Sequence, residues 1–584
     1  MIESRVVDTI IDFIGSPIGP AILLTLGAVI EAVVGRRIRR PDWLTGLALF
    51  FVAGAGALWL GLRAQPVVPV YSRPWQPLLQ DGANLLWVGD GWNWYVSGLT
   101  LLLGGLGILL ELNHHAGATQ RTFDRRTHLH LALHLGVLAG ALLFVGSGNL
   151  LTVVLMWVLL DFLILVRSAM RYDSVTRSQP ESAADDGRRR LRLRYSQRKG
   201  LSLLGALLLL FSLLPAGPAG PGQPLQGGVL PVETVALLLL AAAIRAGVYP
   251  FHLWLMPAEQ HEVYLAERLL EHMIPMLTGL WLMGWAMDFG GEFILLHIEV
   301  LGLIVLALLG SAYTAWRAPD QPAYSTYVLI TSAGVAVLAG ALSLQSGPNA
   351  LIWPTTVFAL GGALWLVGGQ VWRYMGWQLP VSVGALALAG LPFTPGFLVQ
   401  PALARLLVAQ GLFLLLFLLY VAAQSMLIAT MLRSWEGGHR PVDEEIGNGD
   451  LARLMVSALA LGLPLAVAGF LPGSIAAWAS LTNAIPVMLG RLASVVAPWP
   501  VWITLSLPLA LGLLLLWARP RLWPHADEGI PADYALTSLD WLFDLSWWGV
   551  SQISSIWGRT TRLLEGAGAM GWGLVLLLIL YLLQ

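Results

Sequence analysis

Carboxylate and imidazole side chains are concentrated between two apolar runs, in residues 245–279, RAGVYPFHLWLMPAEQHEVYLAERLLEHMIPMLTG. Histidine has a reference pKa of about 6.5, so His272 is the side chain best suited to carry a proton near neutral pH. Arginine stays charged up to about pH 12, so Arg245 can bias its neighbours electrostatically but cannot relay a proton. The segment predicts a hydrated proton inlet, whose titratable candidates are His252, His261, Glu267, Glu271 and His272.

Metal and cofactor sites are not expected. The same segment contains no Glu-x-x-His or His-x-x-x-His pair, so one helical face does not collect two metal ligands. The chain has no cysteine, which excludes iron–sulfur ligation, thiol catalysis and disulfide bonds. We therefore expect no catalytic centre. A second histidine group, HLHLALH, places His130 and His134 on one helical face. The sequence favours two roles for these histidines equally, anchoring at the membrane interface and lining a water path.

The composition requires a bilayer around these side chains. Hydrophobic residues make up 57% of the 584 residues and charged residues 11%, with a mean hydropathy of +0.72. Such a chain has too few polar side chains to cover a soluble globule. Because crossing about 30 Å of hydrocarbon takes roughly 20 apolar residues, we expect an all-α membrane protein. The pattern predicts about sixteen spans, centred near residues 27, 52, 101, 138, 157, 208, 240, 274, 304, 334, 360, 390, 420, 462, 508 and 575.

Arginine-rich loops set the expected orientation. RRIRR follows the first span and RRRLRLRYSQRK at 188–199 follows the fifth, whereas 216–231 after the sixth carries no charge. Basic loops stay cytoplasmic, so both termini are expected on the other side of a prokaryotic-type inner membrane. The 188–199 run could be a nucleic-acid patch, but beside a span the retention signal is the simpler interpretation, and no nucleic-acid partner is expected.

Two predicted spans contain prolines in similar surroundings, Pro250 in AGVYPFHLW and both Pro392 and Pro395 in LAGLPFTPGF. Each proline frees backbone carbonyls at membrane depth, which is tolerated only where protein or a water-filled cavity satisfies them. An odd number of spans, five, separates the seventh span from the twelfth, which inverts the second unit relative to the first. Broken helices at corresponding positions of two inverted halves are typical of transporters, although two prolines can coincide by chance.

The pattern divides the chain into four regions. Residues 1–126 hold the first three spans, 127–290 a first five-span repeat, 291–432 a second repeat, and 433–584 the last spans. In the last region, 533–566 carries Leu, Trp and Ile at helical spacing among polar residues. This predicts a lateral amphipathic helix along the membrane surface, although a plain amphipathic connector fits equally well.

The motifs RAGVYPFHLWL, EHMIPMLTG, AYST at 323–326 and GLPFTPGF at 390–397 follow one another along the chain. In this order they resemble spans 7, 8, 10 and 12 of the antiporter-like proton-channel subunits of respiratory complex I, a family shared with multisubunit cation/proton antiporters and membrane-bound hydrogenases. The match covers most of the chain between about 80 and 410. Sixteen spans, outside termini and a lateral helix suit the largest such subunit. The resemblance implies partner membrane subunits, as in an NADH–quinone oxidoreductase.

The first departures from the family pattern concern its central charge pair. The family has a glutamate directly after a tryptophan in span 5, whereas here Val158 follows Trp157 and the carboxylate is Asp161, one helical turn away. The span-7 lysine is replaced by Arg245. A carboxylate at the bilayer centre costs roughly 2.5–3.5 kcal/mol, so we expect Asp161 and Arg245 to pair. Alternatively, Asp161 lies in a polar pocket without function.

Further departures remove the family's lysines from the second half. Its span-11 lysine and histidine fall on Gly362 and Phe358, and its span-12 lysine falls on Gln400. Around 390–410 the only charged residue is Arg405. We therefore expect a proton path confined to the first half, through His272 with Glu271 or Glu267.

The sequence thus predicts an antiporter-like membrane subunit of a proton- or cation-translocating, complex I-like assembly, with a proton half-channel near the seventh span. A structural subunit that no longer conducts is the first alternative. A stand-alone secondary transporter of a small solute is less favoured, because no substrate-pocket signature is visible. The expected partners are other membrane subunits, the lipid bilayer, and protons or monovalent cations.

Overall fold

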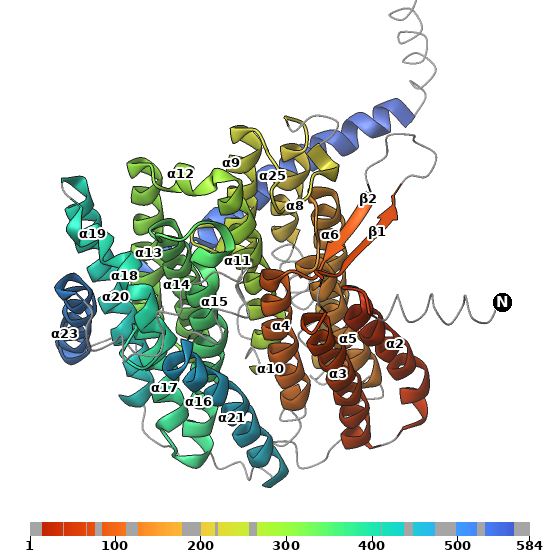
Figure 1. Ribbon diagram of the computed structural model, residues 1–584, viewed down its shortest axis with the longest axis horizontal. Coiled ribbons are helices and arrows are strands. Elements are labelled where there is room, and N and C mark those ends of the chain that lie inside the picture. The colour runs from red at the N-terminus through yellow and green to blue at the C-terminus, as the bar shows by residue number, and fades with distance from the viewer. Residues whose placement is uncertain are drawn as a thin grey trace, which may run out of the picture. The chain divides into compact units, whose positions relative to one another are not determined.

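The computed structural model is built almost entirely from helices, as the composition predicts (Figure 1). The chain divides into two units, Met1–Gly529 and Ile530–Gln584, and each is described by itself. The structure describes residues 15–38, 40–65, 67–75, 84–111, 127–177, 200–215, 220–255, 265–409, 411–436, 448–472, 498–522 and 532–565.

Eleven helical segments in these ranges are long and apolar enough to cross a membrane. The chain is therefore a multi-pass integral membrane protein of the all-α class. The predicted span near 575 lies outside the described residues, so the total of sixteen stays a prediction. Nine of the segments lie in single helices, α3 (Pro41–Arg63), α4 (Gly91–Leu110), α5 (Thr127–Val145), α6 (Leu150–Arg177), α13 (Ile298–Arg317), α14 (Gln321–Ala341), α20 (Leu412–Glu436), α21 (Asn448–Phe470) and α23 (Trp499–Leu522). One begins with α2 (Gly19–Val34) and continues to Arg37, and one begins at Gly347 and ends with α16 (Gly362–Met375).

Shorter helical pieces interrupt or extend these segments. The α-helical ones are α8 (Ser202–Ser212), α9 (Val232–Arg245), α10 (Leu265–Glu267), α11 (Ile274–Ala286), α12 (Glu292–Leu295), α15 (Ile352–Thr356), α17 (Leu379–Ala389), α18 (Gln400–Leu403) and α19 (Arg405–Val408). The 3₁₀ turns are η1 (Gly35–Arg37), η4 (Gly220–Gly222), η5 (Phe251–Leu255), η8 (Gly347–Leu351) and η10 (Pro395–Val399). Wider π-helical turns, which often mark functional sites, form η6 (Arg268–Met273), η7 (Met287–Gly291) and η9 (Val357–Gly361).

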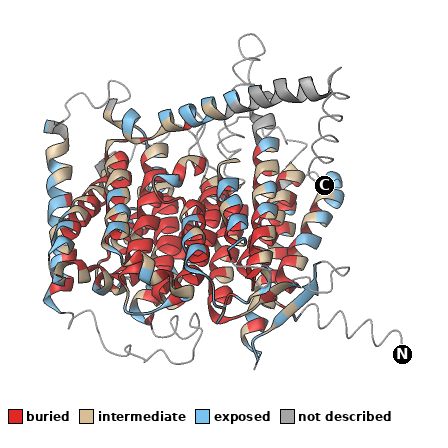
Figure 2. Ribbon diagram, turned by 90° about the horizontal axis from the view of Figure 1, so that it is seen from above, coloured by how far each residue is buried: buried red, intermediate tan, exposed pale blue. Residues whose placement is uncertain are grey.

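Burial separates the inner helices of the first unit from its outer helices (Figure 2). Every residue of α11 is buried, and α14 is buried along most of its length. By contrast, α3 exposes Trp43, Phe50 and Leu60, each by more than half of its surface. Lipid tails are as apolar as leucine, so such outward-facing side chains are stable in a bilayer.

Helix α11 lies between two sets of helices in the first unit. It contacts α4, α5 and α9, which precede it in the sequence, and α14, which follows it. Its approach to the end of α9 depends on Gly279, because a Cβ at that position would lie 2.1 Å from the backbone nitrogen of Ala246. The absence of a side chain therefore allows α11 to pack directly on the segment where α9 stops.

A short β-hairpin between α3 and α4 was not predicted. β1 (Val70–Pro74) pairs antiparallel with β2 (Asn84–Val88), in the register Val70↔Val88 to Pro74↔Asn84. The backbone nitrogen of Val88 donates to the Gly146 carbonyl at 2.8 Å, which joins the hairpin to the turn between α5 and α6. Each strand has five residues, too few for a convincing alternation of apolar and polar side chains.

The first predicted helix break is present but begins earlier than its proline. Helix α9 ends at Arg245, and Gly247 follows with a φ of 66°, a left-handed conformation that closes the helix without a steric penalty. Pro250 lies after this turn and directly before η5. Gly247, rather than Pro250, therefore marks the end of the helix.

The second break has a similar local order. Helix α17 ends at Ala389, Gly390 has a φ of 80°, and η10 begins at Pro395. Pro392 lies in the turn between them, beside Phe393, whose φ of 65° is unusual for a residue with a side chain. Both breaks thus combine a helix, a left-handed glycine and a 3₁₀ turn. The inverted repeats and their boundaries at 127–290 and 291–432 stay a prediction.

The second unit contains α24 (Ala532–Thr537) and α25 (Asp540–Glu565). The predicted helix at 533–566 is therefore present in two pieces. Leu539 separates them with a φ of 62°. Its placement along the membrane surface stays a prediction.

Candidate functional site

Asp161 on α6 and Arg245 at the end of α9 form an ion pair. Nη1 of Arg245 donates to Oδ1 of Asp161, and Nε1 of Trp157 donates to Oδ2 of the same carboxylate at 3.0 Å. The Arg245 side chain is fully buried, and that of Asp161 is 9% exposed. The two side chains that the sequence predicts to pair are therefore in contact, and Trp157 orients the carboxylate from one turn away on the same helix.

Three further helices hold the Arg245 guanidinium in place. Nε donates to Thr278 Oγ1 on α11 at 3.1 Å, and Nη1 donates to Ser202 Oγ on α8 at 3.1 Å. The group also lies 5.5 Å from the ring centre of Phe144 and 5.1 Å from that of Trp157. Charge-assisted hydrogen bonds and cation–π contacts offset part of the cost of removing a cation from water. Arg245 is therefore a fixed positive charge.

A second group of buried charges lies further along α6. We call Glu111, His134, Arg167, Ser168 and Glu271 the Arg167 cluster. Nη1 of Arg167 donates to Glu271 at 2.6 Å and Nη2 donates to Glu111 at 2.9 Å. Ser168 Oγ donates to Glu271 Oε2 at 3.0 Å, and His134 Nδ1 lies 3.5 Å from Glu111 Oε2. The cluster joins four helical elements, α4, α5, α6 and η6.

Sequence reasoning found Glu271 but missed its partners. Arg167 lies near the end of the fifth predicted span and Glu111 at the end of the third, where charges usually belong to loops. The signal that could have found Arg167 is its position within the apolar part of α6. Because Arg167 lies between the two carboxylates, the cluster does not resemble a metal site. Among the described residues, no three His, Asp or Glu side chains are placed to hold a metal ion.

The two charge groups are connected by a pair of facing helices. Asp161 and Ser168 are seven residues apart on α6, and Glu271 and Thr278 are seven residues apart on η6–α11. Ser168 contacts Glu271, while Asp161 and Thr278 both contact Arg245. The two helices therefore run antiparallel, and the groups lie about 10 Å apart along them at 1.5 Å per residue.

His272 follows Glu271 in η6 and is 5% exposed. Along the helix it lies between the Arg167 cluster and Thr278. Glu267 precedes η6 and is only partly buried. Arg268 donates through Nη1 to Ser325 Oγ on α14, so η6 directs charged side chains both toward α6 and toward α14.

His252 lies on η5, directly after the first break, and is fully buried. Its Nε2 is 3.3 Å from the hydroxyl oxygen of Tyr327 on α14, and its ring stacks on Tyr249 at 5.0 Å between centres. The contact with Tyr327 is directed toward α14, whereas Tyr249 lies in the turn between α9 and η5. His261, the other histidine predicted here, lies outside the described residues.

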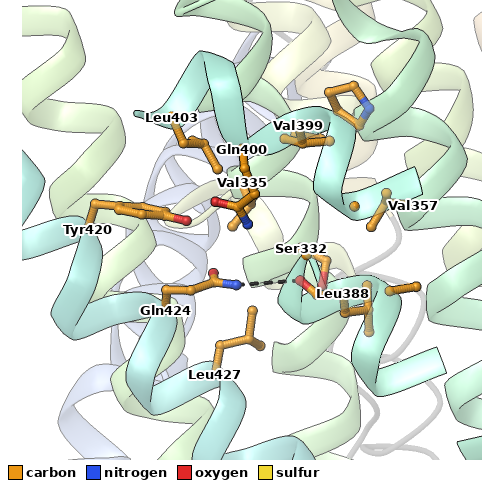
Figure 3. Close-up of a pocket in the computed structure, with 15 residues that line it drawn as sticks. Ser332, Val335, Val357, Leu388, Val399, Gln400, Leu403, Tyr420, Gln424 and Leu427 are labelled. Carbon is orange, nitrogen blue, oxygen red and sulfur yellow. Dashed lines mark hydrogen bonds between the residues drawn. The ribbon is translucent and has the colours of Figure 1, made fainter. Parts of the chain in front are cut away.

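Gln400 lines a small cavity beside the second break (Figure 3). The cavity leaves about 20 Å³ for the centre of a water molecule, and its polar lining includes Ser332, Tyr420 and Gln424. Gln400 Oε1, Gln424 Oε1 and Tyr420 Oη have no hydrogen-bond partner in the part of the chain that the structure describes. A polar space of this size holds about one water molecule. The site is therefore neutral and able to bind water.

The other positions where the resembled family carries titratable groups are apolar. Phe358 in η9 is fully buried. A Cβ at Gly362 would lie 3.2 Å from the side chain of Leu329 and 3.4 Å from that of Met273. Arg405 donates to the carbonyls that end α14, Leu342 at 2.7 Å and Ser343 at 3.0 Å, which is a structural role.

No family model matches the sequence, and no curated protein matches it either. Several solved structures, however, match the chain. The chain superposes on a chain of the Mrp complex from Dietzia sp. DQ12-45-1b with a TM-score of 0.68 and 17% sequence identity. The match includes 96% of the present chain and 62% of the Mrp chain, so the present chain spans less than two thirds of that chain's length. A chain of the membrane-bound sulfane sulfur reductase (MBS), an archaeal respiratory membrane complex, gives a TM-score of 0.62 at 15% identity, with 97% and 99% of the two chains covered.

A chain of respiratory complex I from Thermus thermophilus matches with a TM-score of 0.55 and 17% identity, over 80% of this chain and 100% of that one. The chain has the fold of an antiporter-like membrane subunit. At identities of 15–17% the likeness shows the fold alone. What an antiporter-like fold does in this chain depends on the side chains described above.

Proposed function

We propose that the chain is an antiporter-like membrane subunit of a proton- or cation-translocating assembly, and that it conducts protons through a half-channel beside the break after α9. The observation that supports this most is the pair of buried charge groups on facing helices. An isolated charge in the bilayer centre costs roughly 2.5–3.5 kcal/mol on insertion scales. Apolar residues of similar size would stabilise a purely structural bundle at least as well.

The half-channel extends from the Arg167 cluster to Asp161. Arg167 and Arg245 keep their charges, so they position carboxylates and do not relay protons. Between the two groups the proton has about 10 Å to travel, at 1.5 Å per residue along the helices. His272 lies within this interval and can bind and release a proton near neutral pH. We assign it the role of carrier, with water on either side and Asp161 as acceptor.

The second half favours a second candidate, a structural membrane subunit that does not conduct. Gln400 and Gln424 face the cavity with neutral amides (Figure 3), which neither gain nor lose a proton at accessible pH. Phe358 and Gly362 add no titratable group. If protons exchange only in the first half, this subunit contributes little or no net pumping.

The test is proton translocation by the intact complex reconstituted in vesicles, measured per turnover of its driving reaction. We expect His272→Ala to reduce proton uptake at least tenfold, because the carrier in the interval is lost. Gln400→Lys is expected to restore a titratable group at the second break and to raise net translocation.

His297→Ala is the matched control, because His297 is exposed at the start of α13. It should leave translocation unchanged. If His272→Ala leaves both uptake and coupling intact, the half-channel assignment fails and the structural-subunit function replaces it.

The fold's neighbours are chains of multisubunit membrane complexes, which supports other membrane subunits as partners. We propose that the chain works in a prokaryotic-type inner membrane with both termini on the non-cytoplasmic side. Protons or monovalent cations are the transported species. The basic 188–199 segment, outside the described residues, is assigned a topological role rather than nucleic-acid binding.

A further inference from the structure

Glu31 has a buried carboxyl group that is distant in sequence from the Asp161–Arg245 pair and from the Arg167 cluster. It lies in the last turn of α2, and its side chain is fully buried. Neither carboxyl oxygen has a hydrogen-bond partner in the described residues. Buried polar atoms are satisfied in the great majority of cases, so a carboxyl group with two unsatisfied oxygens requires an explanation.

The position of Glu31 within α2 shows that it faces the protein rather than lipid. The buried residues of the helix include Leu24, Gly27 and Glu31, which form one stripe at helical spacing. Val29 and Val33, on the opposite side, are 56% and 63% exposed. The carboxyl group therefore points toward α3 and α5, the helices that pack against α2.

The residues one turn before and after Glu31 define its surroundings. A Cβ at Gly27 would lie 2.5 Å from the ring of Phe51 on α3. A Cβ at Gly35 would lie 2.7 Å from His128 on α5 and 3.2 Å from Leu44 on α3. Between those two levels, Leu44, Ala48 and Phe51 supply the buried face of α3. Glu31 is thus enclosed mainly by apolar side chains.

Other titratable or charged groups near this corner lie toward the end of α2. His128 and His130 are buried at the start of α5. Arg36 and Arg37 in η1 are exposed, and Asp42 at the start of α3 is exposed and paired with Arg453 at 2.9 Å. None of these groups donates a hydrogen bond to Glu31. An ionised carboxylate would therefore be left without compensation, whereas a neutral acid would not carry a charge into this environment.

We infer that Glu31 is a proton-binding site in its own right, a neutral carboxylic acid held between α2, α3 and α5 and separate from the half-channel. The ligand is a single proton, which the unfolded chain releases at neutral pH because an ordinary glutamate has a pKa of about 4.3. This site does not depend on the proposed half-channel.

Infrared difference spectroscopy tests the protonation state directly. The spectrum of the full chain in its native complex is compared with that of Glu31→Gln at pH 7, in light and heavy water. We expect the difference to contain one carboxylic-acid carbonyl band per chain, shifted in heavy water, that disappears reversibly at alkaline pH. Glu299→Gln, at an exposed position of α13, should remove a carboxylate band instead. Loss of a carboxylate band in Glu31→Gln at pH 7 overturns the proposal.

Thermal unfolding provides an independent measurement. Folding takes up the proton on Glu31, so stability of the wild type should fall relative to Glu31→Gln, whose amide needs no proton, as pH rises from about 4 to about 7, and should level off at higher pH. We expect the variant to accumulate normally and to unfold at the same temperature or higher at pH 9. An amide variant that fails to assemble, or that is less stable at every pH, contradicts a neutral acid at this position.

Discussion

Arginine is the residue type that keeps its charge at every accessible pH, and the contact with Arg245 therefore defines the chemistry of Asp161. A buried lysine can lose its proton and join a relay, whereas a guanidinium cannot. Hydrogen bonds from Arg245 and Trp157 engage both oxygens of Asp161. In the proposed half-channel, proton transfer at this pair must therefore occur on the carboxylate alone, with the arginine as counter-charge.

The ion pair makes a prediction about paired substitutions. Asp161→Asn or Arg245→Gln alone leaves one buried charge without its partner, which costs about 3–5 kcal/mol. Substituting both removes both charges, so the double variant should be more stable than either single variant. Assembly yield and melting temperature of the purified complex provide the measurements. Because the double variant should lose less stability than either single variant, the coupling should be at least as large as the smaller single loss, about 3 kcal/mol or more, and strictly additive losses would argue against the pair.

The Arg167 cluster leads to a second prediction. Arg167→Gln leaves Glu111 and Glu271 close together without their common cation, and we expect a loss of about 3–5 kcal/mol of stability. Arg373→Gln, at an exposed position of α16, is the matched control and should change stability by less than about 0.5 kcal/mol. The measurement is the melting temperature of each variant, which should be lower for Arg167→Gln than for Arg373→Gln. Equal melting temperatures would mean that the cluster does not hold α4, α6 and η6 together.

At the scale of elements, local patterns were predictable, whereas most distant contacts were not. In the part of the chain that the structure describes, the long apolar runs form helices, and prolines lie close to the two breaks, because both signals lie within one segment. The exact end of α9 depends on the left-handed Gly247 rather than on Pro250. Arg245 could be paired with Asp161 because both charges lie inside apolar runs. The pairing of Glu111 with Arg167 could not be predicted, because a charge at the end of a span needs no buried partner.

The close packing of α11 on α9 predicts a sensitive glycine. Gly279→Ala places a Cβ 2.1 Å from the backbone of Ala246, so α11 must move away from the segment that carries Arg245. Overpacking of this kind costs about 1–3 kcal/mol. Gly302→Ala on α13 meets nothing within 4 Å and should be nearly neutral. Thermal stability of the two variants tests this, and a neutral Gly279→Ala would show that the helices can separate freely.

At the scale of the whole molecule, the arginine distribution predicts topology. In the segment 168–199, α6 continues to Arg177, and the basic end at 188–199 should be cytoplasmic, with residue 584 on the opposite side, because basic loops are retained in the cytoplasm. Site-specific labelling or reporter fusions at both positions in intact cells measure this. Both sites on one side would rule out an arrangement with sixteen spans and outside termini.

The Arg167 cluster also has a consequence for membrane voltage. It contains two carboxylates, Glu111 and Glu271, and one guanidinium, so with His134 neutral its formal charge is minus one. One bound proton brings the cluster to electrical neutrality. Moving an elementary charge across the full membrane potential involves about 2.3 kcal/mol per 100 mV, and a proton reaching this depth crosses part of that field. In the proposed half-channel, filling the cluster with this proton is therefore expected to be an electrogenic step, with an occupancy that depends on voltage as well as on pH.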